Sequence, residues 1–229
     1  MNPEPHQGFF LTFEGLDGSG KTTQIRRLSA WLAAKNIPQT LTRQPGGTAT
    51  GDRIRALLLD SKSANLSPRT ELAMMFADRA QSIQEIIAPA LAQGHVVVCD
   101  RFTDSTEAYQ GGGRELGSQI VLDMHRLICG SLQPDLTILL LPDIQTSLSR
   151  ARRRNNHQIK ATNTDESRFE CEQDAFFHRV HDKYSEIAAR EPLRVVTIEG
   201  NLNPDEVYAR VINAVRERLG QANLALPVS

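Results

Sequence analysis

The amino-acid sequence predicts an α/β protein built on a five-stranded parallel sheet, with helices on both faces. Short apolar runs alternate along the chain with segments of helical period, as in parallel sheets. Two of these runs, residues 96–98 and 138–141, are continuously apolar, which is typical of strands covered on both faces. A glycine-rich sequence also joins the first run to the first helical segment, a junction that parallel sheets use to bind ligands.

The predicted elements can be placed in chain order. We expect strands at residues 9–14, 39–43, 95–100, 136–141 and 194–199. Helical period follows the glycine-rich loop and recurs at residues 54–58, 69–91, 120–128, 144–153 and 205–219. Ser67-Pro68 and Asn203-Pro204 each place a capping side chain before a proline, which marks a helix start. We expect Pro89 to kink or shorten the last turn of its helix, and the tail after residue 219 to fray.

Length and composition limit the classes of protein. The 229 residues suit one α/β domain spanning 1–229, and 40% hydrophobic with 23% charged residues allow a sizeable core. A net charge of −1 argues against a broad nucleic-acid surface. Three widely spaced cysteines without metal spacing favour a reducing compartment. No signal sequence and no run of roughly 18 apolar residues is present, so we expect a cytoplasmic protein without a membrane span.

The glycine-rich loop carries the most specific signal. Residues 15–22 fit G-x-x-x-x-G-K-[ST] at every fixed position, between a predicted strand and a predicted helix. Glycines allow successive backbone N–H groups to turn toward a phosphate, and the following helix directs its positive end at the same anion. Lys21 adds a charge near the terminal phosphates, and the Thr22 hydroxyl can bind Mg²⁺. A plain glycine-rich turn would not need Lys21 and Thr22.

Charged residues follow two other predicted strands. Arg43 ends a strand before a Gly-Gly turn, and Arg55 follows one helix later, which suits a second anion. Asp100 and Arg101 end the strand at 95–100, where P-loop proteins place a metal-binding carboxylate. A solvated arginine and a local ion pair are the simpler alternatives for these sites.

Two further segments could contact a planar base. Phe76 and Arg79 share a helical face, although a core phenylalanine beside a salt-bridged arginine is the commoner arrangement. Tyr109 and Gln110 precede three glycines in a stretch that we expect to be flexible, and the Gln110 amide offers a donor and an acceptor. An ordinary loop would explain this stretch equally well.

Residues 150–170 form a long polar stretch with Arg150 and Arg154 at one end and Arg168 at the other. A mobile lid that closes over phosphates needs this composition. A solvated helix face is the alternative.

Taken together, the sequence resembles the thymidylate kinase family from residue 10 to about residue 219. The resemblance rests on five motifs in a fixed order, at residues 13–23, 42–48, 100–102, 108–114 and 168–170. It implies the three-layer P-loop kinase fold with a mobile lid, Mg²⁺-assisted phosphoryl transfer from ATP to dTMP, and a homodimer.

The resemblance also implies site residues. ATP would bind at Gly15, Leu16, Asp17, Gly18, Ser19, Gly20, Lys21, Thr22 and Thr23. The acceptor nucleotide would contact Asp17, Arg43, Arg55, Met75, Phe76, Arg79, Arg101, Thr106, Tyr109 and Gln110. Thr22 and Asp100 would hold the metal. Catalytic roles would fall to Lys21, Asp100, Arg101, Arg150, Arg154 and Arg168.

Gln44 and the pair Met75 and Phe76 differ from the family pattern, and Gly18 distinguishes between two types of family member. Gly18 stands where some members carry an arginine in the loop, which implies the bacterial type with catalytic arginines in the lid. Gln44 replaces a glutamate or an apolar residue. Met75 occupies the usual base-stacking position, with Phe76 beside it, so either side chain could stack.

Other functions remain as alternatives. A monophosphate kinase could use dUMP, dCMP or GMP, although Arg79, Thr106, Tyr109 and Gln110 favour thymine. A P-loop switch ATPase should show an Asn-Lys-x-Asp or Asp-x-x-Gly motif after the third strand, and neither is present. An inactive binding module would not need Lys21, Thr22 and Asp100.

Overall fold

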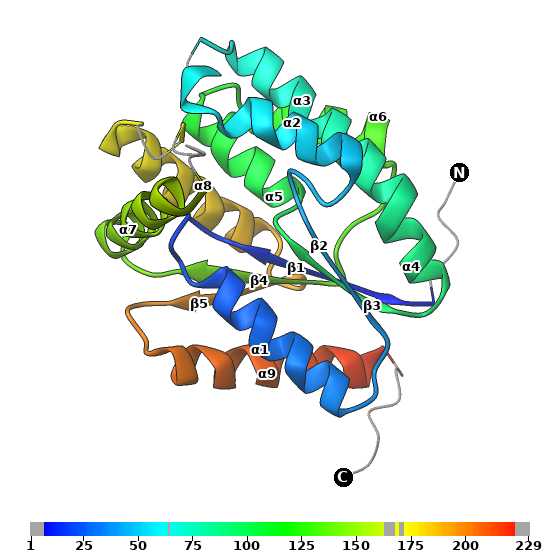
Figure 1. The fold of residues 1–229 in the computed structure, drawn as a ribbon. Coiled ribbons are helices and arrows are strands. Elements are labelled where there is room, and N and C mark those ends of the chain that lie inside the picture. The colour runs from blue at the N-terminus through cyan, green and yellow to red at the C-terminus, as the bar shows by residue number, and fades with distance from the viewer. Residues whose placement is uncertain (1–6, 64, 163–167, 170–171, 223–229) are drawn as a thin grey trace.

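A parallel sheet of five strands forms the centre of the molecule (Figure 1). The computed structural model describes residues 7–63, 65–162, 168–169 and 172–222, without the side chains of residues 62, 154 and 156–162. The strands are β1 (Phe9–Glu14), β2 (Gln39–Arg43), β3 (Val96–Asp100), β4 (Leu136–Leu141) and β5 (Val195–Glu199), in the order β2-β3-β1-β4-β5. The predicted sheet is therefore confirmed, with strand boundaries that differ by at most one residue.

Helices cover both faces of the sheet (Figure 1). Helices α1 (Lys21–Ala34) and α9 (Pro204–Gln221) lie on one face, where they pack on alternate β1 residues such as Leu11 and Phe13. The other face carries α2 (Ala49–Leu59), α3 (Pro68–Ser82), α4 (Ala88–Ala92), α5 (Thr103–Thr106), α6 (Ser118–Cys129) and α8 (Asp174–Arg190). Phe10 points to this face and packs on Ile87 and Leu91. The central strands β1, β3 and β4 are buried on both sides, which explains their continuous apolar sequences.

The predicted helix starts are confirmed. The Ser67 hydroxyl accepts from the Thr70 N–H at 3.1 Å before Pro68. Asn203 and Glu206 form a reciprocal capping box before α9. Among the described residues, no helix combines the length and apolar character needed to cross a bilayer.

Two helical regions differ from the sequence expectation. A π-helical turn, η2 (Ile83–Ile87), separates α3 from α4, and Pro89, the second residue of α4, has no N–H to continue the α-helical pattern. The stretch expected to be flexible is a buried π-helix, η3 (Glu107–Gly113), between α5 and α6. Its glycines allow α8 to approach, since a Cβ on Gly113 would lie 2.4 Å from the Phe176 ring.

The segment after β4 also differs. Helix α7 (Ile144–Thr162) extends through much of the stretch predicted as a polar lid. Helix α8 was not predicted, although Phe176, Val180, Tyr184 and Ile187 follow a helical period and are buried. Charged residues between these positions made the helical period difficult to recognise in the sequence.

Candidate functional site

The carboxyl ends of the strands lie together, as a parallel sheet requires. Arg43 is opposite Asp100, and Phe13 is opposite Asp100 on the other side of β3, so the loops after β1, β2 and β3 begin at one level. A cavity of about 800 Å³ opens at this edge. Ligands bind at this position in open α/β sheets.

The phosphate loop joins β1 to α1 through backbone conformations that favour glycine. Gly15 has φ +130°, and a Cβ there would lie 2.2 Å from the Leu140 carbonyl oxygen. Lys21 begins α1, and its Nζ donates to the carbonyl oxygens of Gly15 at 3.0 Å and Leu16 at 2.9 Å. Burial, reinforced by the charge of Arg101, lowers the pKa of Lys21 to about 8. The loop and the start of α1 together form a site for an anion.

Arg101 connects the end of β3 to the phosphate loop. Its guanidinium donates to Asp17 Oδ1 at 3.0 Å, to the Ser105 hydroxyl at 2.9 Å, and to the hydroxyls of Tyr184 at 3.3 Å and Tyr109 at 3.4 Å. These partners come from four different elements or loops. Arg101 is therefore fixed in orientation before any ligand binds.

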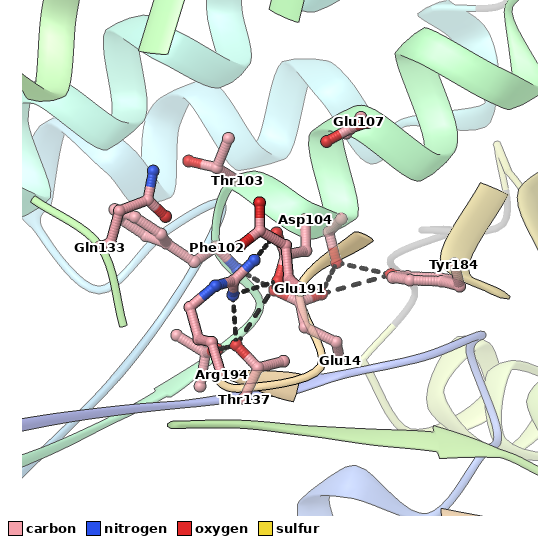
Figure 2. Close-up of polar contacts among 12 residues, drawn as sticks. Glu14, Phe102, Thr103, Asp104, Glu107, Gln133, Thr137, Tyr184, Glu191 and Arg194 are labelled. Atoms are coloured by element: carbon pink, nitrogen blue, oxygen red, sulfur yellow. Dashed lines mark hydrogen bonds and ion pairs between the residues drawn. The ribbon is translucent and has the colours of Figure 1, made fainter. Parts of the chain in front are cut away.

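A buried carboxylate supports this arrangement from below. Glu14 Oε1 accepts from the Phe102 N–H at 2.7 Å, and Oε2 accepts from the Ser105 hydroxyl and from the Tyr184 hydroxyl at 3.3 Å. Figure 2 shows Glu14, Phe102 and Tyr184 beside the Asp104–Arg194 ion pair. Burial and the nearby Asp104 carboxylate raise the pKa of Glu14 to about 7. Glu14 thus ties β1 to the segment that follows Arg101.

Arg79 is buried and held by three partners. Its Nε donates to Gln44 Oε1 at 2.8 Å, and one terminal nitrogen donates to the Phe102 carbonyl at 3.1 Å and the Thr106 hydroxyl at 2.9 Å. Its other terminal nitrogen, Nη1, is buried and has no hydrogen-bond partner among the described residues. Gln44, which departs from the family pattern, accordingly serves as a neutral acceptor for Arg79.

Gln110 has a similar half-satisfied side chain. Its Nε2 donates to Glu71 Oε1 at 2.7 Å. Its Oε1 is buried and finds no partner within the part of the chain that the structure describes. Both Arg79 and Gln110 line the cavity, and each carries one buried polar atom, a donor on Arg79 and an acceptor on Gln110, that no described residue satisfies.

The loop after β2 is held by two carboxylates. Asp78 Oδ1 accepts from the Gly46 N–H at 2.8 Å, and Asp52 Oδ1 accepts from the Gly47 N–H at 3.1 Å and from Arg43 at 3.1 Å. Arg55 donates to the Pro45 carbonyl at 3.2 Å. Arg43 and Arg55 both line the cavity, as the second anion site requires.

Most of the predicted site residues meet at the cavity. Its lining includes Asp17, Gly18, Ser19, Gly20, Lys21, Thr22, Thr23, Arg43, Arg55, Met75, Arg79, Asp100, Arg101, Thr106, Tyr109, Gln110 and Arg150. Gly15 and Leu16 do not line it, and they contribute carbonyl oxygens to Lys21 instead. The Arg154 side chain lies outside the described residues.

Two of the predicted positions are corrected by the structure. Phe76 does not line the cavity, because it packs in the core beneath the Arg79 guanidinium, whose Cζ lies 4.8 Å from the ring centre. Met75 is therefore the residue of this pair that reaches the cavity. Arg168 is buried away from the cavity and binds Glu71 at 2.6 Å, the Leu58 carbonyl at 3.1 Å and the Ser63 carbonyl at 3.1 Å. These contacts make Arg168 a structural anchor in this conformation.

Several cavity residues were not predicted. Arg153 lies three positions after Arg150, on the same helical face, which a count along α7 would have shown. Ser105, Asn155 and Phe169 also line the cavity. Phe169 follows Arg168 and meets the Tyr109 ring edge-to-face at 5.7 Å, a long-range contact with no sequence signal.

The residues predicted to hold a metal suit Mg²⁺ bound together with a nucleotide. Asp100 Oδ1 is buried and without a partner among the described residues, and it shares the cavity with the Thr22 hydroxyl. Such a site supplies one or two protein oxygens and leaves the other positions to phosphate and water. The described residues contain no cluster of three or more His, Cys, Asp or Glu side chains that would hold a metal alone.

Comparison with known proteins agrees with this geometry. The family model described as Thymidylate kinase matches residues 13–211. The chain belongs to the thymidylate kinase family. Thymidylate kinase from Pelobacter propionicus is 44% identical over 220 residues, covering 96% of this chain and 99% of that protein. Thymidylate kinase from Solidesulfovibrio magneticus is 46% identical over 210 residues, covering 92% and 100%.

The fold agrees as well. A crystal structure of thymidylate kinase from Ehrlichia chaffeensis superposes with a TM-score of 0.72 at 32% identity, covering 91% of this chain and 98% of that one. Membership of the thymidylate kinase family thus extends from the sequence motifs to the arrangement of the sheet and its helices.

Proposed function

We propose that the protein transfers the γ-phosphoryl group of ATP to the 5′-phosphate of dTMP, giving dTDP and ADP. Family membership supports the reaction. The choice of dTMP as acceptor is supported by Arg79 and Gln110, which line the cavity where the base would bind. The buried Arg79 Nη1 is a donor and the buried Gln110 Oε1 is an acceptor, and both lack partners among the described residues. Thymine presents the complementary edge, with an acceptor at O4 and a donor at N3–H.

Cytosine presents the opposite edge, because it carries an amino group at C4 and an unprotonated N3. It would place a donor against Arg79 and an acceptor against Gln110. Unpaired buried polar groups of this kind cost far more than a missing apolar contact. The pair Arg79 and Gln110 therefore favours thymine over cytosine.

The rest of the cavity suits two anionic nucleotides. The phosphate loop and Lys21 form the donor end, while Arg43, Arg55 and Arg101 surround the place of the acceptor phosphate. Asp17, already bound to Arg101, lines the same cavity and can accept from the acceptor sugar. Tyr109 packs beside Arg101, with its ring centre 5.0 Å from the guanidinium Cζ, and limits the space for a ribose 2′-hydroxyl.

Phosphoryl transfer requires alignment and charge neutralisation rather than covalent chemistry from the protein. The protein aligns the acceptor phosphate through fixed arginines and supplies further positive charge from Arg150 and Arg153 on α7. Asp100 and Thr22 would hold Mg²⁺, which would help to neutralise the charge of the phosphates. We further propose that the chain acts as a single domain and, by family resemblance, as a cytoplasmic homodimer.

A direct assay tests the proposal. ADP release is measured with ATP and Mg²⁺ against dTMP, dUMP, dCMP and GMP. We expect kcat/KM to be highest for dTMP and at least about a hundredfold lower for dCMP. If dCMP or GMP is as good an acceptor as dTMP, the proposed substrate is wrong.

A further inference from the structure

The Gln110 amide lies between the cavity and a buried carboxylate. Glu71, in α3, is fully buried, and its Oε1 accepts from Gln110 Nε2 at 2.7 Å. An ionised carboxylate only accepts hydrogen bonds. If the amide were turned over, Gln110 Oε1 would face Glu71, and two acceptors would meet in a buried position. This contact therefore permits one orientation of the amide.

Two guanidinium groups keep the carboxylate in place. Arg168 donates to Glu71 Oε2 at 2.6 Å, and Arg114 donates to Oε1 at 3.2 Å and Oε2 at 3.3 Å. A buried carboxylate needs such cationic partners. Arg168 is itself held by backbone carbonyls of Leu58 and Ser63. Both oxygens of Glu71 thus accept from a guanidinium group, which holds the carboxylate in the position where Oε1 meets Gln110.

We propose that Glu71 is a specificity-determining positioning residue, which fixes the Gln110 amide so that only its oxygen faces the base. This inference rests on the proposed function. Without Glu71, the amide could present either its oxygen or its NH₂ group to the cavity. A reversible amide fits the N3 atom of cytosine as well as the N3–H of thymine. Glu71 therefore prevents Gln110 from accepting the wrong pyrimidine, although it does not line the cavity.

The first test replaces the carboxylate with an amide. In Glu71→Gln, the new side chain can donate as well as accept, so both orientations of Gln110 become possible. We expect the ratio of kcat/KM for dTMP to kcat/KM for dCMP to fall by about tenfold or more. A merely structural role would reduce the active fraction for both acceptors and leave this ratio unchanged, which would overturn the proposal.

Glu172→Gln is the matched control. Glu172 also pairs with Arg114, at 2.6 Å, so this change removes a carboxylate from the same arginine. Among the described residues the Gln110 amide donates to Glu71 and not to Glu172, and we expect the ratio to stay at the wild-type value. An equal fall in Glu172→Gln and Glu71→Gln would attribute the effect to Arg114 and overturn the proposal.

Two further variants keep the test decisive. Glu71→Asp retains the charge that Arg114 and Arg168 need but withdraws the acceptor from Gln110, so it serves if Glu71→Gln does not fold. We expect its ratio to fall as well, and an unchanged ratio counts against the proposal.

In a Gln110→Ala background, Glu71→Gln should have no additional effect on the ratio, and a full additional effect would show that Glu71 does not act through Gln110.

The proposed function and this inference fail in different ways. If the wild-type protein itself shows no preference for dTMP over dCMP, the proposed substrate is wrong. If the wild-type protein prefers dTMP and every Glu71 variant retains that preference, only the role of Glu71 is wrong.

Discussion

Gly18 in the phosphate loop lies directly against the backbone of Ser147 in α7. A Cβ at Gly18 would be 2.1 Å from the Ser147 carbonyl oxygen and 2.9 Å from the Ala151 nitrogen. Gly18 also has φ +80°, which disfavours any other residue. The loop position at which some family members carry an arginine is therefore occupied here by the helix that carries Arg150 and Arg153.

Gly18→Ala should destabilise the protein for two reasons, the positive φ at this position and the clash of the new Cβ with Ser147. Gly94 has nearly the same φ, +78°, but a Cβ there would meet nothing within 4 Å, so Gly94→Ala is the matched control. We expect a loss of about 1 kcal/mol in the free energy of unfolding for Gly94→Ala and about 2–4 kcal/mol for Gly18→Ala. Urea unfolding measures both. Equal losses would mean that α7 can move away from the loop without cost.

The binding of ATP should weaken in alkaline solution. Burial lowers the pKa of Lys21 to about 8, so the free protein loses this charge as the pH rises through that value. We expect kcat/KM for ATP to fall above about pH 8, because this parameter reports the ionisation of the free protein. The Lys21→Arg variant should be less active but should not show this fall between pH 7 and about pH 10, since a guanidinium stays charged. The same descending limb in Lys21→Arg would assign it to another group.

Arg168 and Arg150 should respond differently to replacement. Arg168→Met breaks a buried ion pair with Glu71, and we expect it to lower the free energy of unfolding by about 3 kcal/mol. Arg150 is exposed and lines the cavity, so Arg150→Ala should change stability by less than about 0.5 kcal/mol and lower kcat by about 10³-fold. Chemical unfolding and steady-state kinetics separate the two effects. A large kcat defect in a fully folded Arg168→Met protein would show that Arg168 has a catalytic role.

The free energy of unfolding should decrease as the pH rises toward neutrality, because of the raised pKa of Glu14. Its pKa is raised from 4.5 to about 7 in the folded protein, so between these values the unfolded chain has lost a proton that the folded protein retains. Stability therefore falls with rising pH across this window. In Glu14→Gln this component should vanish. Urea unfolding at several pH values from 4.5 to 7 compares the slopes, and identical slopes would contradict a raised pKa.

The sheet was predictable because its strands carry their own signal. Continuous apolar runs such as residues 96–98, and the glycine loop between β1 and α1, depend on neighbours in sequence. The residues at strand ends were predictable for the same reason, since parallel strands bring their carboxyl ends to one edge. Arg43 and Asp100 follow from this rule alone.

The remaining features depend on contacts between distant segments. Phe76 and Met75 are adjacent, and only the packing of α3 decides that Met75 reaches the cavity. Arg168 was expected at the reaction because the family resemblance implies catalytic arginines in the lid, but Glu71, 97 positions earlier, holds it in the interior. Gly111, Gly112 and Gly113 suggested flexibility, whereas α8 packs on Gly112 and Gly113, and Gly111 lies against Gly117 and Val121. Glycine patterns do not distinguish a mobile loop from a close approach of two helices.

The two ends of the cavity differ in how much order they already possess. Arg79, Arg101 and Gln110 are held by hydrogen bonds in the free protein, whereas Arg150 and Arg153 are exposed on α7. Ordering a long side chain on binding costs on the order of 1 kcal/mol of conformational entropy. Arg79, Arg101 and Gln110 therefore meet a ligand with their rotamers already restricted, and the entropic loss falls on the nucleotide that orders Arg150 and Arg153. Calorimetry of the wild-type protein and of Arg150→Ala should show which nucleotide that is, because the variant lowers the entropic cost for that nucleotide alone.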